Sequence, residues 1–244
     1  MYKLLALLFI LSCHCLSNAT DITIVTEQYP PYNYQEEGVI KGMSSQVVQA
    51  VLHELDLEVP IKIYPWARAY RLASTQKNVL IYSISRIPQR ETQFKWVGVI
   101  APISFSVLAL KKRDDLKIHY LQDLQPLKIG TVLGDALDQY FTKKGFKHLM
   151  KSNSQKMAMK VFLAGRSDVW PTSTQAGTYL LKSAGLSPTE MVREVLVLED
   201  FSAGNQYMAF SLKTDDSLVN HFKEALYRIK QKGIYKSIID KYKN

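Results

Sequence analysis

Apolar residues along the chain follow two alternating patterns, short continuous runs and stripes with helical spacing. The runs at residues 22–25, 59–64 and 79–84 predict strands, because each is short and bounded by polar or turn-forming residues. Ser44 is the predicted N-cap of a helix after the first strand, and a shorter helix is predicted from about Ala67. The apolar face of the first helix comprises Val47, Val48, Val51, Leu52 and Leu55. This alternation predicts a mostly parallel sheet covered by helices.

The same alternation restarts in the second half of the chain. Strands are predicted at residues 103–111, 127–132, 168–170 and 192–198, with helices between them that end at Gly145, Gly165 and Gly185. The repeat predicts a second lobe, residues 103–206, inserted into a first lobe formed by residues 20–102 and 207–244. The predicted fold is therefore α/β, with two lobes that each contain a mostly parallel sheet flanked by helices. Two crossings between the lobes predict a hinge beside a cleft.

Residues 1–19 have the pattern of a cleaved secretory signal peptide. Lys3 precedes an apolar run from Leu4 to Leu11, and small side chains follow at residues 17–19. The run is shorter than the ~20 residues that a membrane-spanning helix needs. We therefore expect export to the periplasm. Both cysteines, Cys13 and Cys15, lie in this segment, so no disulfide is expected, while lipidation of Cys13 is an alternative to simple cleavage.

The formal net charge is +9, from 31 basic and 22 acidic residues. The lysines are scattered or grouped near predicted helix ends, and no nucleic-acid-binding motif is found, so no nucleic-acid partner is predicted. Four histidines, His53, His119, His148 and His221, lie far apart and share no metal-ligand spacing. The sequence thus predicts neither a metal nor a cofactor, and it does not favour an enzyme.

Polar and aromatic side chains follow two of the predicted strands. Residues 27–32 come directly after the first strand, and residues 83–90 complete and follow the strand at 79–84. In an open α/β sheet, ligands bind in the crevice beyond the carboxyl ends of the strands. The sequence therefore predicts a small-molecule site at this edge.

Four segments, taken in order, resemble the periplasmic solute-binding proteins of polar amino acid ABC importers, family 3. They are Tyr29-Pro30-Pro31-Tyr32, the turns at Gly38 and Gly42, residues 85–90, and the C-terminal stretch from Ala225 to Tyr242. The resemblance covers essentially the whole chain after residue 19. It implies a type II two-lobe clamshell that closes on a small-molecule ligand. It also implies a monomer that delivers this ligand to a membrane permease.

The resemblance also implies roles for residues of the first lobe. Arg90 corresponds to the arginine that holds the ligand carboxylate, and Ser83 and Ser85 would add hydroxyl groups. Tyr29 and Tyr32 would form an aromatic wall. Glu27 would meet a cationic or hydroxylated part of the ligand, and it is also the candidate acid or base of an enzymatic alternative.

The chain departs from the family pattern at three places. Met43-Ser44-Ser45 stands where a phenylalanine and an aspartate often open the first helix. Gly134-Asp135-Ala136 replaces a turn that usually carries two hydroxyl side chains, and Ser173 replaces the acidic residue that neutralises the ligand's α-ammonium group. The last departure weakens the inference to an α-amino acid.

Four further residues are candidates for the ligand site. Trp66 and Arg68 follow a predicted strand and would supply a stacking face and an anion contact, although Trp66 is equally suited to pack a helix onto the sheet. Trp170 would close over the ligand or belong to the core, and Ser173 completes the set.

The predicted function is an extracytoplasmic solute-binding protein that captures a small carboxylate-bearing solute for an ABC importer. The alternatives are a dehydratase-like periplasmic enzyme on the same scaffold and a ligand-binding partner of a separate sensor. The sequence leaves open the identity of the ligand and the choice between transport and sensing.

Overall fold

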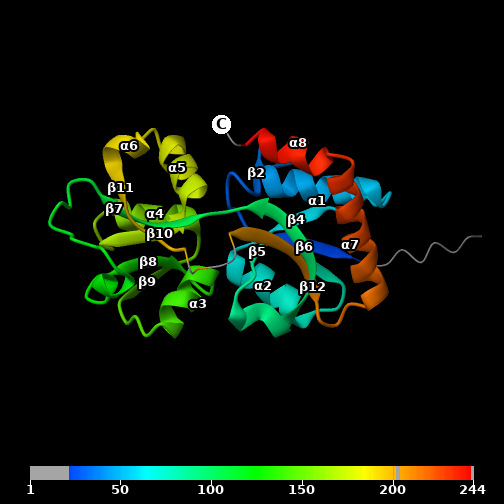
Figure 1. The fold of residues 1–244 in the computed structure, drawn as a ribbon, viewed down its shortest axis with the longest axis horizontal. Helices are drawn as coiled ribbons and strands as arrows, with labels where there is room; N and C mark the ends of the chain where they lie inside the picture. Colours follow the sequence, from blue (N-terminus) through cyan, green and yellow to red (C-terminus); the bar gives the residue numbers. More distant parts are fainter. Residues whose placement is uncertain (1–21, 200, 202–203, 243–244) are drawn as a thin grey trace, which may run out of the picture.

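The computed structural model describes residues 22–199, 201 and 204–242, which form two α/β lobes lying side by side (Figure 1). The predicted signal peptide at residues 1–19 lies outside the described residues. No helix in the described part of the chain is both long and apolar enough to cross a bilayer.

The first lobe is built on a five-stranded sheet in the order β4-β1-β5-β12-β6. Its strands are β1 (Thr23–Thr26), β4 (Ile61–Ile63), β5 (Val79–Ser85), β6 (Phe94–Pro102) and β12 (Asn205–Ser211). The helices of this lobe are α1 (Met43–Glu54), α2 (Trp66–Thr75), α7 (Asp216–Gln231) and α8 (Ile234–Asp240), with the 3-10 helix η1 (Pro88–Gln93). A small hairpin, β2 (Tyr34–Glu36) with β3 (Val39–Lys41), precedes α1.

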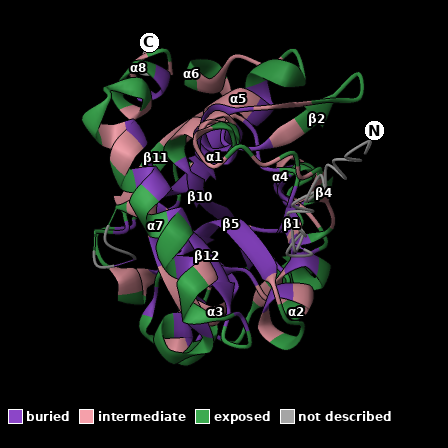
Figure 2. Cartoon of the chain, turned by 90° about the vertical axis from the view of Figure 1, so that its right-hand side faces the viewer, coloured by how far each residue is buried: buried purple, intermediate pink, exposed green. Residues whose placement is uncertain are grey.

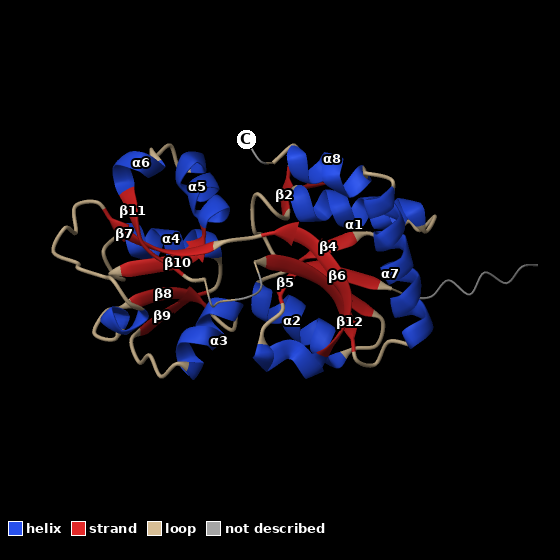
Figure 3. Ribbon diagram, in the orientation of Figure 1, coloured by secondary structure: helices blue, strands red, loops and turns tan. Residues whose placement is uncertain are grey.

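The second lobe contains a five-stranded sheet in the order β11-β7-β10-β8-β9. Its strands are β7 (Phe105–Leu110), β8 (Ile129–Val132), β9 (Leu149–Ser152), β10 (Val169–Ser173) and β11 (Val192–Val197). The helices are α3 (Ala136–Lys143), α4 (Gln155–Leu163), α5 (Thr174–Ser183) and α6 (Pro188–Met191), with the 3-10 helix η2 (Leu121–Leu124). Helices flank the strands in both lobes (Figure 3), and the central strands are buried (Figure 2).

These features confirm the predicted two-lobe α/β fold with one correction. The sheets are mixed rather than mostly parallel. In the first, β1 pairs in parallel with β4 and β5, whereas β12 is antiparallel to β5 and β6. The reason is connectivity, since β12 returns from the second lobe and enters the sheet between two strands that run the other way.

Two adjacent chain segments connect the lobes, one after β6 and the other before β12. The backbone N–H of Ile103 in the first segment donates to the carbonyl of Gly204 in the second at 2.9 Å. Asn205 and Gln206, which the predicted boundaries put in the second lobe, pair with β6 of the first sheet. The lobe boundaries themselves stay a prediction, and paired segments of this kind are suited to a hinge.

The N-termini of three helices show how far local sequence determines where a helix begins. Asp135 and Ser154 cap α3 and α4, where they accept hydrogen bonds from the N–H groups three residues ahead. The prediction that Ser44 caps α1 is wrong. The helix begins at Met43 after Gly42, and the N–H of Ser44 donates to the carbonyl of Tyr32 at 2.8 Å. A neighbouring loop therefore satisfies donors that a cap would otherwise take.

Candidate functional site

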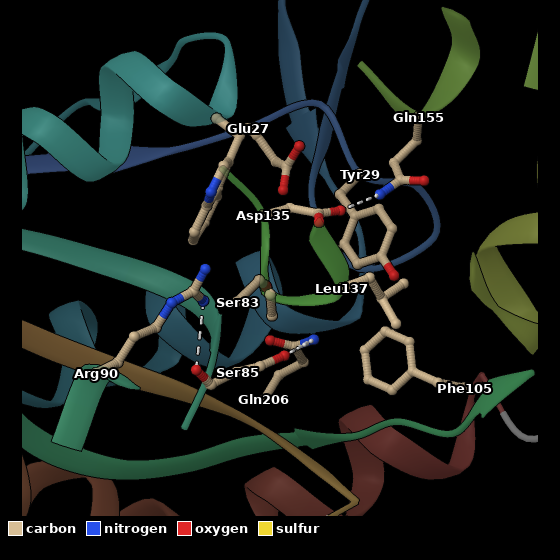
Figure 4. A pocket seen from close by; sticks show the side chains of 12 residues that line it. Glu27, Tyr29, Ser83, Ser85, Arg90, Phe105, Asp135, Leu137, Gln155 and Gln206 are labelled. Atoms are coloured by element: carbon tan, nitrogen blue, oxygen red, sulfur yellow. Dashed lines mark hydrogen bonds between the residues drawn. The ribbon is translucent and has the colours of Figure 1, made fainter. Parts of the chain in front are cut away.

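A cavity between the lobes is lined by twelve residues (Figure 4). The first lobe contributes Glu27, Tyr29, Trp66, Ser83, Ser85, Arg90 and Gln206, and the second contributes Phe105, Asp135, Ala136, Leu137 and Gln155. The parallel pairing of β1 with β5 brings their carboxyl ends to one edge, as predicted. The structure thus brings six of the ten predicted site residues to one cavity.

Arg90 is a buried cation with unused hydrogen-bonding capacity. It is 1% exposed, and its guanidinium carbon lies 5.0 Å from the ring centre of Trp66 and 5.1 Å from that of Tyr70. Its Nη atoms donate weakly to the carbonyls of Ser85 at 3.4 Å and Gly134 at 3.3 Å, while Nε has no hydrogen-bond partner among the described residues. Burial lowers the pKa of Arg90 to about 10, so the side chain stays charged at neutral pH. An incompletely bonded buried guanidinium favours an anionic ligand.

Two carboxyl groups share this cavity with Arg90. Glu27 follows β1 and Asp135 precedes α3, and each is 8% exposed. Burial, assisted by the charge of Asp135 and opposed by that of Arg90, raises the pKa of Glu27 to about 8. Burial also raises the pKa of Asp135 to about 7, against hydrogen bonding from the Asp138 backbone and the charge of Arg90. Both groups therefore titrate near neutral pH.

Replacing Glu27 with Gln should change how stability depends on pH. The folded protein holds a proton on Glu27 up to a pKa of about 8, whereas the unfolded chain releases it near the ordinary value of 4.5. The folded state therefore binds more protons across this interval, and stability from this group falls as pH rises through it. The slope is at most about 1.4 kcal/mol per pH unit. Urea unfolding at pH 5, 7 and 9 should show a shallower decline for Glu27→Gln. Parallel profiles would contradict the assignment.

Ser83 and Ser85 lie near the end of β5, and their side chains line the cavity beside Gln206. Ser83 has a φ of 57°, and its hydroxyl has no hydrogen-bond partner in the described part of the chain. The register with β12 shifts at this point, so Ser83 occupies a β-bulge. Bulges and left-handed non-glycine residues cluster at functional sites, where they direct a side chain toward a ligand. Gln206 donates to the Ser85 hydroxyl at 3.4 Å.

The two predicted wall tyrosines have different positions. Tyr29 lines the cavity, and Tyr32 stacks on it with ring centres 5.2 Å apart. The hydroxyl of Tyr32 reaches the second lobe, where it lies 3.2 Å from the Ser173 hydroxyl and donates to Gln175 at 2.5 Å. Tyr32 therefore packs against Tyr29, which lines the cavity, and its hydroxyl links the first lobe to the second.

Besides Tyr32, three predicted site residues lie outside the cavity lining. Arg68 is exposed and places its guanidinium over the Tyr64 ring at 4.2 Å, because its position on α2 points it to solvent. Trp170 is fully buried in the core beside Phe162, so the core alternative is correct. Ser173 is buried as the N-cap of α5, where it accepts from Ala176 at 3.1 Å.

From the second lobe the sequence predicts Trp170 and Ser173, but not the residues of that lobe that line the cavity. The predicted set lacks Phe105, Asp135, Ala136, Leu137 and Gln155 of the second lobe. It also lacks Gln206 on β12. The turn Gly134-Asp135-Ala136, which departs from the family pattern, was the available signal, since a strand-to-helix turn at a sheet edge is where ligands bind in α/β proteins. Among the described residues, no three metal-ligating side chains gather as a metal site.

Comparison with known proteins agrees with this architecture. The arginine-binding periplasmic protein of Mannheimia haemolytica is 26% identical over 243 residues, covering 98% of this chain and 97% of that protein. A histidine kinase sensor domain similar to periplasmic binding proteins has a TM-score of 0.81 at 19% identity, covering 92% of this chain and 96% of its own. An ancestral arginine-binding protein bound to arginine has a TM-score of 0.78 at 20% identity, covering 91% and 98%. At these identities the two structures show the fold alone.

The profile of bacterial extracellular solute-binding proteins, family 3, matches residues 22–244. This range includes both sheets and all twelve residues that line the cavity. The chain therefore belongs to the bacterial extracellular solute-binding proteins of family 3.

Proposed function

We propose that the protein captures a small carboxylate-bearing solute, an amino acid or a related molecule, in the cavity between its lobes. The observation that carries the proposal is Arg90, which is buried against the cavity with its Nε unpartnered. A guanidinium binds a carboxylate through two parallel hydrogen bonds, and such charge-assisted bonds contribute ~1.5–3 kcal/mol each. The protein would act in the periplasm as a monomer and release its ligand, unchanged, to an ABC importer permease.

The contacts between the lobes support capture by closure. Trp66 donates its Nε1–H to the Gly134 carbonyl at 2.8 Å, and Arg90 donates to the same oxygen. Arg90 thus lies against both lobes at once, with Ser85 on one side and Gly134 on the other. A carboxylate that contacts both Arg90 and the turn before α3 would bind the closed state more tightly than the open one and so favour closure.

A thermal-shift screen of the purified protein tests this function. A ligand that binds only the folded protein stabilises it by about 2.7 kcal/mol at a concentration a hundred times its Kd, so a hit raises the melting temperature. We expect hits among amino acids and small carboxylic acids. Hits confined to molecules without a carboxylate, such as polyamines or neutral sugars, would contradict the proposal.

A second candidate function is an enzyme that uses Glu27 as a general acid. The raised pKa of Glu27, about 8, keeps a proton on this group at neutral pH, which is a property of catalytic acids. Incubation of each screen hit with the protein, followed by mass spectrometry, separates the two functions. Conversion of the ligand that is lost in Glu27→Gln would favour the enzyme, and recovery of unchanged ligand would favour binding alone.

A further inference from the structure

The second lobe presents a carboxylate to the cavity at Asp135, in the turn before α3. Its Oδ1 accepts from the N–H of Asp138 at 2.7 Å, and its Oδ2 accepts from Gln155 at 3.3 Å. These are neutral donors, and no lysine or arginine in the described part of the chain lies within ion-pair distance of this carboxylate. Capping alone does not require the charge, since Asn and Ser cap helices as well as Asp does.

Glu27 faces the same cavity from the opposite lobe (Figure 4). Its side chain is 8% exposed and has no hydrogen-bond or ion-pair partner within the described residues. With Arg90 the cavity therefore brings together two acidic groups and one basic group. Buried carboxylates without cationic partners are unfavourable, and they either take up protons or bind a cation.

We propose that Asp135 is a specificity-determining residue that, together with Glu27, selects solutes carrying positive charge in addition to a carboxylate. This inference rests on the proposed function, because it takes Arg90 as the partner of the carboxylate. The Nε of Arg90, unpartnered and buried at the same cavity, independently marks this space as a ligand site.

Charge balance identifies the class of ligand. An amino acid with a cationic side chain carries one negative and two positive groups, and its two cations would displace the protons that burial keeps on Glu27 and Asp135, which then match it as one guanidinium and two carboxylates. Such a ligand would leave no charge in the closed cavity unpaired. A neutral zwitterion, by contrast, would pair with only one of the two carboxyl groups and leave the other protonated, so it would gain one ionic contact fewer. We therefore expect preference for a basic amino acid.

Arginine and citrulline provide a matched pair of probes, because citrulline has nearly the same shape but an uncharged ureido group. Calorimetric titration of the wild-type protein should show at least tenfold tighter binding of L-arginine than of L-citrulline. The variants Asp135→Asn and Asp135→Ser both retain an N-cap, so they should fold. Each should reduce the arginine-to-citrulline affinity ratio at least fivefold.

Asp168→Asn is the control for loss of a second-lobe carboxylate. Asp168 accepts from Arg113 at 2.9 Å and does not line the cavity, so its replacement should leave the ratio unchanged. Equal affinity of the wild-type protein for arginine and citrulline would overturn the inference while leaving the proposed function intact. An unchanged ratio in both Asp135 variants would also overturn it. Failure of every carboxylate-bearing solute to bind would overturn the proposed function itself.

Discussion

Replacing Arg90 with Met should weaken binding of a carboxylate-bearing ligand at least tenfold, which corresponds to about 1.4 kcal/mol. Methionine retains an apolar stem between Trp66 and Tyr70 but removes the donors that we assign to the ligand. Because Arg90 is 1% exposed, the ligand would lose an ionic partner that water replaces poorly. Isothermal titration calorimetry with a ligand found in the screen measures the effect.

Arg86 provides a matched control for Arg90. It lies four residues earlier, is more exposed, and donates its Nε–H to Glu91 at 2.7 Å rather than facing the cavity. Exposed ion pairs contribute about 0–1 kcal/mol to stability, so Arg86→Met should fold normally and bind the ligand with nearly unchanged affinity. Equal losses in the two variants would show that the effect is not specific to the cavity, and an unchanged affinity in folded Arg90→Met would refute the carboxylate contact.

Replacing Gly42 with Ala should reduce the free energy of unfolding by about 3 kcal/mol or more, through backbone strain and steric overlap. Gly42 has a φ of 108°, which side chains rarely tolerate. A Cβ atom there would lie 2.5 Å from the carbonyl oxygen of Tyr32 and 2.8 Å from the backbone nitrogen of Asn33. This is the carbonyl that accepts from the N–H of Ser44, so relief of the overlap would also weaken the start of α1.

A comparison with Gly38→Ala separates the cost of backbone strain from the cost of steric overlap. Gly38 has a φ of 80°, but an added Cβ would meet no atom within 4 Å. Gly38→Ala should therefore lose only about 1 kcal/mol, from the unfavourable backbone conformation. Urea unfolding of the two variants measures the difference, and a Gly42→Ala variant as stable as Gly38→Ala would contradict the overlap.

The fold was largely predictable because its signals are local. Apolar runs and helix-ending glycines predict the alternating strands and helices. Two of these glycines, Gly165 and Gly185, have positive φ values of 70° and 74°, as a helix C-terminus requires. Sheet direction was not predictable in this way. Whether β12 runs parallel or antiparallel depends on where the chain re-enters the first sheet, and this is set by packing between residues far apart in sequence.

The site was predictable only in the first lobe, where residues at or after the ends of β1, β4 and β5 line the cavity. Arg90, Ser83 and Ser85 follow from the pattern around β5 and from the resemblance to the solute-binding family. Asp135 was noticed only as a departure from that family, since its role depends on a cavity wall formed by the other lobe.

Side-chain direction explains why three of the predicted site residues lie outside the cavity lining. Arg68 is two positions after Trp66 on α2, and this spacing turns it away from the face that Trp66 presents to the cavity. Trp170 and Ser173 share β10, whose residues are buried along the whole strand, so neither alternation nor composition separates core from site.

A crystal structure of the protein with its ligand tests the central claim most directly. The account predicts a closed complex in which a ligand carboxylate lies within about 3.2 Å of the Arg90 guanidinium, between β5 and the turn before α3. A ligand bound outside this cavity, or one that places no anionic group against Arg90, would contradict the account.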